Sequence, residues 1–216
     1  FIIPKLMPLV GLAQNKYHEH DAYKHTLITT FNTEPIIIQR LAALLHDIGK
    51  QVTVTKNSEG THSFYGHEKE SATMARQILT GLKFPNIIVD KVSKIIKLHM
   101  LTKQWGNELK DVKDKTIRKF VKKAGDDMED LLGLIHADNL SHAKEFIMAK
   151  QVDTIRSRII EIQNRKEPIK MPISGVDIME FFEVGTGREV GALLKVGENI
   201  FLDEPTVSKN NLLLAI

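Results

Sequence analysis

The stretch that decides the fold is His46-Asp47-Ile48-Gly49-Lys50, which directly follows the apolar run Leu41-Ala42-Ala43-Leu44-Leu45. The run predicts a helix packed in a core, and Gly49 predicts where that helix ends. A histidine beside an aspartate at the end of a buried helix is costly unless something compensates both, and a bound cation usually does so. The stretch therefore predicts a metal centre at the end of a core helix.

Candidate ligands lie on or near the ends of several predicted helices. They are His25, His46, Asp47, His67, His99 and Asp138. Helices that pack side by side can direct such groups into one cavity. Imidazole and carboxylate ligands without thiolate favour Mn, Fe, Ni, Co, Zn or Mg. A carboxylate such as Asp47 can bridge two ions, which together can bind a phosphoryl oxygen and activate water.

The rest of the chain predicts a mostly α fold, a helical bundle interrupted by one small β-hairpin. Helices are expected over residues 21–31, 35–46, 67–82, 85–99, 114–124, 126–140 and 141–165, with a loop-like stretch at 100–109. The hairpin is expected over about residues 52–65, because Val52-Thr53-Val54-Thr55 alternates and turn residues follow it.

The C-terminal part differs from the bundle in composition. Pro168 and Pro172 predict the end of the last bundle helix, and glycines separate short apolar segments beyond it. We therefore predict one domain over residues 1–166 and a C-terminal helical tail over residues 167–216.

Composition narrows the class of protein. With 216 residues, 42% of them hydrophobic, the chain can bury a large core. The absence of cysteine excludes disulfides, thiolate catalysis and Cys-based zinc sites. No run approaches the roughly 18 apolar residues of a membrane span, and the start Phe1-Ile2-Ile3-Pro4 lacks signal-peptide features. We expect a cytoplasmic protein without membrane association, and the sequence sets no oligomeric state.

Charge leaves one feature open. The formal net charge of +3 is not typical of a strong nucleic-acid binder. A basic stretch nevertheless contains Lys110, Lys113, Lys115, Arg118, Lys119, Lys122 and Lys123. It fits either a solvated helix face or a surface that contacts a phosphate backbone.

The ordered set of histidines and aspartates resembles the HD superfamily of metal-dependent phosphohydrolases. That pattern is a histidine, then His-Asp, then a distant aspartate, and it matches here as His25, His46-Asp47 and Asp138. His67 and His99 match the extra histidines of members that bind two ions. The resemblance implies that the first four residues hold one divalent ion, with Asp47 as the bridge, and that the other two help to hold a second.

A closer resemblance is to the HD domain of bacterial CCA-adding tRNA nucleotidyltransferases and the poly(A) polymerase family. It is carried by residues 15–27, 41–50 and 63–71, and by the tail from Ile173 to Leu194. Those enzymes also carry a nucleotidyltransferase head with an Asp-x-Asp pair, which this sequence lacks. We therefore expect that this chain does not add nucleotides by itself.

The resemblance implies catalytic roles for Asp47, Lys50 and His67. Lys50 is the candidate contact for a phosphate oxygen, although it also fits an exposed cation at a helix end. Arg118 is a second candidate for substrate binding, because guanidinium binds phosphate in a bidentate manner. The alternative for Arg118 is a surface position in the basic stretch.

Several other side chains carry weaker predictions. His18, His20 and His62 are expected outside the ligand set, and His136 is excluded because it does not share a helix face with Asp138. His142, one turn after Asp138, is a candidate for lining the cavity. Trp105 fits core packing, or stacking on a base.

These observations leave two functions open. The first is a phosphomonoesterase or 2′,3′-cyclic phosphodiesterase that acts on a nucleotide or an RNA-end phosphate with one or two divalent ions. The second is a non-catalytic module that binds tRNA or serves as a scaffold. A third, a deoxynucleotide triphosphohydrolase or signalling phosphodiesterase, is disfavoured because the Gly-Tyr-Pro motif of the cyclic-di-GMP branch is absent.

Overall fold

The computed structural model describes residues 2–56, 58, 60–164, 171–204 and 206–216. Its α-helices are α1 (Ala22–Asn32), α2 (Ile37–Leu45), α3 (Lys50–Thr53), α4 (His67–Gly81), α5 (Asn86–Leu98), α6 (Asp114–Ala124), α7 (Met128–Leu140), α8 (Gln151–Asn164), α9 (Gly175–Phe182), α10 (Arg188–Asp203) and α11 (Lys209–Leu214). Short 3₁₀ helices are η1 (Pro4–Leu9), η2 (His99–Trp105), η3 (Gly125–Asp127) and η4 (Lys144–Phe146).

The chain divides into two compact units. The first contains residues up to Val112 together with Phe120–Ser157, and the second contains Lys113–Lys119 with Arg158–Ile216. The predicted boundary at residues 166 and 167, the end of the predicted helix at Arg165 and the predicted stop at Pro168 lie outside the described residues. The boundary therefore stays a prediction.

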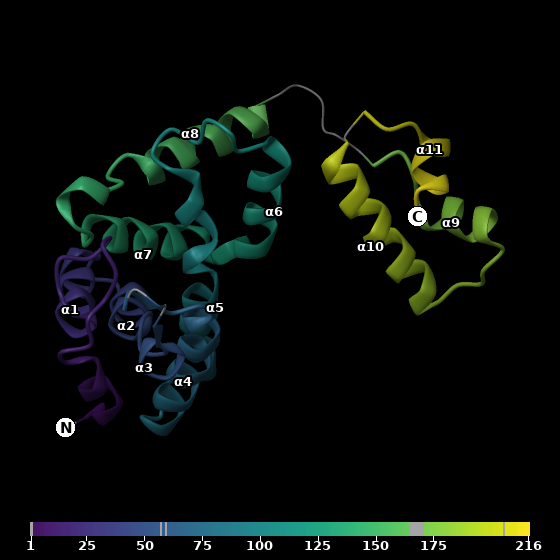
Figure 1. The fold of residues 1–216 in the computed structure, drawn as a ribbon. Coiled ribbons are helices and arrows are strands. Elements are labelled where there is room, and N and C mark those ends of the chain that lie inside the picture. The colour runs from purple at the N-terminus through teal and green to yellow at the C-terminus, as the bar shows by residue number, and fades with distance from the viewer. Residues whose placement is uncertain (1, 57, 59, 165–170, 205) are drawn as a thin grey trace. The chain divides into compact units, whose positions relative to one another are not determined.

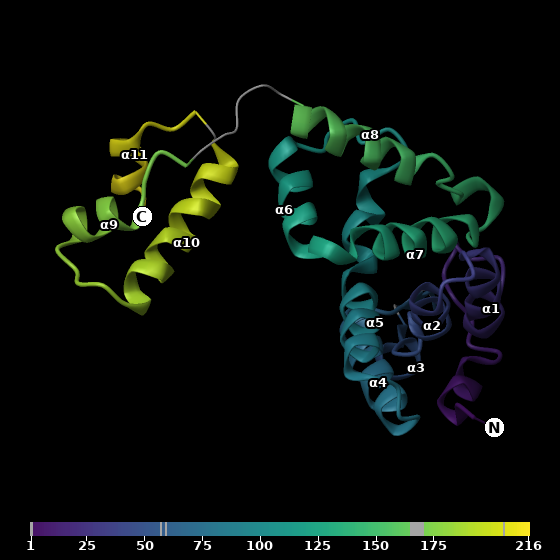
Figure 2. The same ribbon diagram turned by 180° about the vertical axis from the view of Figure 1, so that it is seen from behind.

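Helix packing forms the core of the first unit. Helices α4 and α5 lie side by side, and α7 packs against α1, α2 and α5 (Figures 1 and 2). Apolar residues surround much of α7, and Leu131, Leu132, Leu134 and Ile135 are all buried. A helix that is apolar on several faces is typical of the centre of a bundle, and α7 accordingly lies at the centre of this unit.

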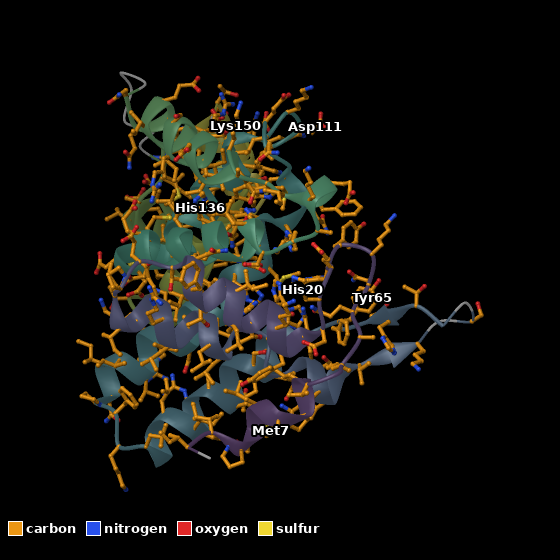
Figure 3. All side chains as sticks on the ribbon, turned by 90° about the vertical axis from the view of Figure 1, so that its left-hand side faces the viewer. Met7, His20, Tyr65, Asp111, His136 and Lys150 are labelled. Carbon is orange, nitrogen blue, oxygen red and sulfur yellow. The ribbon has the colours of Figure 1, made fainter. Side chains whose placement is uncertain are left out.

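The small hairpin exists but is shorter than predicted. Strand β1 (Thr55–Lys56) pairs antiparallel with β2 (His62–Ser63), and the hairpin projects from the helices (Figure 3). The prediction was wrong at Val52 and Thr53, which belong to α3. The backbone N–H groups of both residues donate to the carbonyl of Gly49, so the chain resumes helical bonding directly after that glycine.

Two other boundaries differ from the prediction. Residues 99–105, expected to be mostly loop, form the 3₁₀ helix η2, and α8 begins at Gln151 instead of residue 141. The segment before α8 bends because the N–H of Ala143 donates to the carbonyl of Tyr17 at 2.9 Å. This long-range bond anchors a stretch whose local composition suggests helix.

The tail is helical, as predicted. Helices α9, α10 and α11 pack around a cluster of buried side chains, namely Ile173, Ile178, Val190, Phe201, Leu212 and Leu213. A capping box between Ser174 and Asp177 begins α9, and Asp177 also pairs with Lys209 at the start of α11. Among the described residues, no helix combines the length and the apolar character that crossing a bilayer requires.

Candidate metal centre

The six predicted ligand residues converge in the first unit. They come from α1 (His25), the turn after α2 (His46 and Asp47), the start of α4 (His67), the junction of α5 and η2 (His99) and the end of α7 (Asp138). Each is at most 6% exposed. Residues up to 113 positions apart in sequence, from His25 to Asp138, therefore share one buried cluster.

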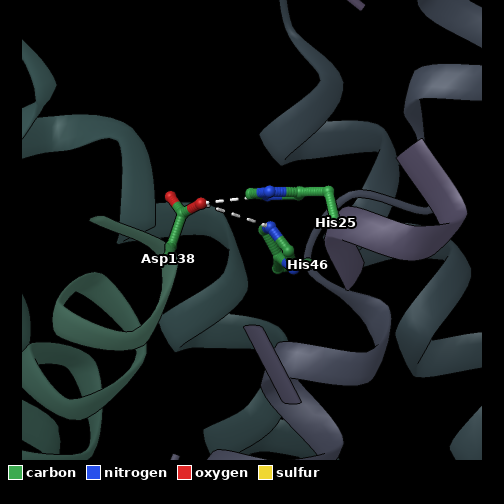
Figure 4. Close-up of side chains that lie close together, drawn as sticks. All are labelled: His25, His46 and Asp138. Carbon is green, nitrogen blue, oxygen red and sulfur yellow. Dashed lines mark ion pairs between the residues drawn. The ribbon is translucent and has the colours of Figure 1, made fainter. Parts of the chain in front are cut away.

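One side of the cluster is formed by Asp138 and two imidazoles. The Oδ1 atom of Asp138 lies 3.1 Å from Nε2 of His25 and 3.8 Å from Nε2 of His46 (Figure 4). Ligand atoms of these three buried residues all lie within 4.8 Å of one another. This spacing allows the three groups to share one ion.

Asp47 faces two sets of imidazoles with its two oxygens. Its Oδ2 atom lies 3.4 Å from Nε2 of His25 and 3.1 Å from Nε2 of His46, whereas Oδ1 lies 3.2 Å from Nε2 of His67. His99 completes a second group, since its ligand atom lies within 4.8 Å of those of His46 and Asp47. The two oxygens of Asp47 thus face different imidazoles.

Backbone carbonyls fix the orientation of the four imidazoles. In three of them Nδ1 lies 2.6–2.8 Å from the carbonyl oxygen three residues earlier in the chain, in the pairs His46 with Ala43, His67 with Phe64 and His99 with Ile96. In His25, Nδ1 lies 3.3 Å from the carbonyl oxygen of Ser141. A carbonyl can only accept, so Nδ1 carries the hydrogen and Nε2 keeps the lone pair that binds a metal.

The inner atoms of the cluster fit a cation. The Nε2 atoms of His25, His46 and His67 are buried and make no hydrogen bond of acceptable geometry. Buried polar atoms are normally hydrogen-bonded, and leaving them unpaired is costly. Three buried imidazole nitrogens beside the Asp47 carboxylate match the donor set of a divalent ion.

The charges of the cluster also suit metal binding. Burial raises the pKa of Asp47, but His46 and Lys50 outweigh that effect and hold the pKa well below its usual value. Burial likewise raises the pKa of Asp138, but Lys103 and His25 outweigh it and hold that pKa well below its usual value too. Both carboxylates are therefore ionised at neutral pH, the form in which they bind metals.

The imidazoles differ in the direction of their pKa shifts. Burial lowers the pKa of His25, and it lowers the pKa of His99 to about 3, so both are neutral at neutral pH. Burial lowers the pKa of His46 as well, but the charge of Asp47 outweighs it and the pKa is raised. The neutral rings of His25 and His99 can act as ligands without losing a proton. The ring of His46 interacts with the carboxylate of Asp47.

Lys50 and Arg118, the predicted anion contacts, lie in different parts of the chain. The Nζ atom of Lys50 is 2.6 Å from Oδ2 of Asp47 and 2.6 Å from Oε1 of Gln14, and the residue is only 4% exposed. The alternative of an exposed helix-end cation is therefore wrong for Lys50. Arg118 is on α6, in the segment assigned to the second unit, and its role stays a prediction.

Sequence reasoning missed one cation of the centre. The Nζ atom of Lys103 lies 2.5 Å from Oδ2 of Asp138, and Lys103 follows His99 by four residues. The sequence holds no local signal for it, because its partner Asp138 is 35 residues further along the chain.

Two further imidazoles adjoin the cluster. The ring of His18 packs edge-on against that of His25, with 4.7 Å between the ring centroids. The Nε2 atom of His142 lies 4.0 Å from Oδ1 of Asp138. His142 thus lines the site, whereas Nδ1 of His62 contacts the carbonyl oxygen of Ala13 at 2.7 Å. Trp105 packs edge-on against Phe120 at 5.3 Å, which favours core packing for that side chain.

Comparison with known proteins identifies the family. The HD domain family matches residues 23–169. The CC-adding tRNA nucleotidyltransferase of Thermus thermophilus is 32% identical over 199 residues, which cover 89% of this chain and 44% of that protein. The A-adding tRNA nucleotidyltransferase of Deinococcus radiodurans is 27% identical over 206 residues, which cover 89% of this chain and 45% of that protein. The chain thus spans less than half the length of these relatives, and it belongs to the HD domain family.

Proposed function

We propose that this chain is a metal-dependent phosphohydrolase that acts on a nucleotide or RNA-end phosphate, as a phosphomonoesterase or a 2′,3′-cyclic phosphodiesterase. The observation that carries the proposal is the convergence of buried imidazole Nε2 atoms, already in the tautomer that binds metals, on two ionised carboxylates. Membership of the HD family supports the same chemistry.

The six buried residues of the cluster are the proposed metal ligands. His25, His46, Asp47 and Asp138 would hold one ion, and His67 and His99 would complete a site for a second across Asp47. A divalent ion of the Mn, Fe, Ni, Co or Mg type supplies Lewis acidity toward phosphate and lowers the pKa of water. The burial of all six residues keeps bulk water away, which strengthens every charge interaction within the centre.

An RNA end is the favoured substrate because of the relatives. The two proteins from Thermus thermophilus and Deinococcus radiodurans are named as tRNA nucleotidyltransferases. We extend tRNA to this chain as a proposed partner, with Arg118 and the neighbouring lysines as candidate contacts to its phosphate groups. Such contacts weaken with rising salt because counterions are released on binding.

The same comparisons favour a second candidate function. A chain that spans less than half the length of tRNA nucleotidyltransferases could bind tRNA or support another domain without hydrolysing phosphate. In that case the metal would stabilise the bundle, and the buried cluster would have a structural role.

Metal-dependent hydrolysis tests the first function. Protein stripped with a chelator is supplied with Mn²⁺ or Ni²⁺ and assayed on p-nitrophenyl phosphate, bis-p-nitrophenyl phosphate and 2′,3′-cyclic AMP. We expect metal-dependent activity that Asp47→Ala abolishes. Asp90→Ala, which removes an exposed carboxylate of α5 paired with Arg76, is the matched control and should retain activity.

The outcomes separate the two functions. Equal activity of the Asp47→Ala variant and the unmodified chain would show that the proposed site is wrong. Salt-dependent tRNA binding without hydrolysis of any probe would instead favour the binding module.

A further inference from the structure

A second lysine, Lys103, contacts the centre at Asp138, whereas Lys50 contacts it at Asp47. Lys103 lies on η2, and its Nζ atom is 2.5 Å from Oδ2 of Asp138 and 3.1 Å from Nε2 of His142. The side chain of Lys103 is 17% exposed, against 5% for that of Lys50. The two carboxylates of the centre therefore each have one ammonium partner.

The two lysines contact their carboxylates in different ways. Lys50 approaches Oδ2 of Asp47, the same oxygen that faces His25 and His46. Lys103 approaches Oδ2 of Asp138, whereas the imidazoles face the other oxygen, Oδ1. Lys103 thus occupies the outer oxygen of its carboxylate and leaves the inner oxygen turned toward the imidazoles.

A buried amide network holds the segment that carries Lys103. The side-chain Nε2 of Gln151 donates to the carbonyls of Thr102 and Gly106, at 3.0 Å each. Its Oε1 accepts from the hydroxyl of Thr102 at 3.2 Å and from Nδ2 of Asn139 at 3.0 Å. These bonds join η2, α7 and α8 beside Asp138, so both partners of the lysine–carboxylate pair stand on one fixed frame.

The contact of Lys103 with His142 separates that histidine from the ligand set. An ammonium group can only donate, so Nε2 of His142 accepts and its hydrogen is on Nδ1. The four candidate ligand histidines have the same tautomer, with the Nδ1 hydrogen directed at a backbone carbonyl, but the Nε2 atoms of His25, His46 and His67 face the carboxylates of the centre and no ammonium group. Lys103 therefore blocks the nitrogen with which His142 would otherwise approach the centre.

We propose that Lys103 is a positioning residue of the metal centre, which holds Asp138 so that Oδ1 faces the ion bound by His25 and His46. The inference rests on the proposed metal-dependent function. Partners that orient a ligating carboxylate typically change metal affinity by about 10- to 100-fold. The role is thus one of metal affinity, exerted through Asp138.

Metal titration of the apoprotein tests this role without an activity assay. The Kd for Mn²⁺ is measured by calorimetry after chelator treatment. We expect Lys103→Met to raise the Kd about tenfold or more. Lys103→Arg keeps a cation that pairs with carboxylates, and its Kd should stay within about threefold of the unmodified chain.

Lys94→Met is the matched control, because it removes a comparable lysine–aspartate contact, 2.7 Å from Lys94 to Asp127, outside the centre. Its Mn²⁺ Kd should not change. Circular dichroism establishes whether each variant folds. If Lys103→Met does not fold, Lys103→Gln replaces it, with a Kd expected to be at least about fivefold above that of Lys103→Arg.

The positioning role would be overturned if a folded variant with an uncharged residue at position 103, Lys103→Met or Lys103→Gln, had a Kd for Mn²⁺ within about twofold of that of the unmodified chain. Suppose that Lys103→Met weakens Mn²⁺ binding but the unmodified chain hydrolyses none of the phosphate probes. That result would support the positioning role and overturn the hydrolase proposal. An unmodified chain that binds no Mn²⁺ would overturn both.

Discussion

The backbone N–H of Gly49 donates a hydrogen bond to the hydroxyl of Ser71 at 2.8 Å. This bond joins the turn that carries His46 and Asp47 to helix α4, which begins at His67. The approach requires glycine, because a Cβ at position 49 would lie 2.6 Å from the carbonyl oxygen of His67 and 2.6 Å from the amide nitrogen of Ser71.

Gly49→Ala should therefore lower the free energy of unfolding by about 2 kcal/mol, the usual cost of forcing an extra group into a packed interior. Urea unfolding measures the change. Gly81→Ala, at the other end of α4 with nothing within 4 Å of the new Cβ, is the control and should be neutral or stabilising by up to about 1 kcal/mol. Equal losses in the two variants would refute the close-contact explanation.

The number of bound ions should depend on His67. Because Oδ1 of Asp47 faces His67 while Oδ2 faces His25 and His46, we expect two ions per chain. His67→Ala should reduce the ratio of metal to protein by one ion, as measured by elemental analysis after Mn²⁺ loading and desalting.

His62→Ala serves as the control for this loss, because His62 is bound to the carbonyl of Ala13 and should leave the ratio unchanged. A ratio of one in the unmodified chain, unaltered by His67→Ala, would show a centre with a single ion.

The pH dependence of stability should reveal the pair of Asp127 with Lys94. Burial raises the pKa of Asp127, but Lys94 and Lys91 outweigh it, and the pKa lies below its usual value. A lowered pKa means that the stabilisation is present above the unfolded pKa of about 3.9 and is lost as the pH falls through the folded pKa. Asp127→Asn should cost about 1 kcal/mol at pH 7 and progressively less below pH ~4.

Urea unfolding of both proteins between pH 7 and pH 3 provides the measurement. Asp90→Asn, which neutralises the exposed partner of Arg76, should change stability little at any pH. A difference between Asp127→Asn and the unmodified chain that stays constant down to pH 3 would contradict the ion-pair explanation.

The start of α1 should depend on Asp21. Its carboxylate accepts from the backbone N–H of Lys24 at 2.7 Å and from that of Gly11 at 2.9 Å. Asp21→Ala should lower the free energy of unfolding by about 1 kcal/mol, whereas Asp21→Asn keeps an acceptor and should lose less. Chemical denaturation compares the two variants, and equal losses would argue against capping as the cause.

The sequence was sufficient for the helical bundle because apolar periodicity is a local signal. The six residues that converge were predicted from their ordered set, which resembles the HD superfamily, since the His-Asp pair by itself is common. It failed at Val52, where alternation predicts a strand although that side chain is 63% exposed and lies in α3. It also failed to identify Lys103, since its partner Asp138 is 35 residues further along the chain. A lysine considered alone is most often a surface residue, and only the tertiary fold shows the contact.

The anchoring of His46, His67 and His99 to carbonyls three residues earlier has a consequence for how such a centre can change over time. Each ring is aimed by a four-residue turn of its own, so its hydrogen position does not depend on any neighbouring helix. Packing elsewhere in the bundle can therefore diverge, or be redesigned, while each of these rings still presents Nε2 as its free nitrogen. In this fold the coordination chemistry is modular at the level of single turns.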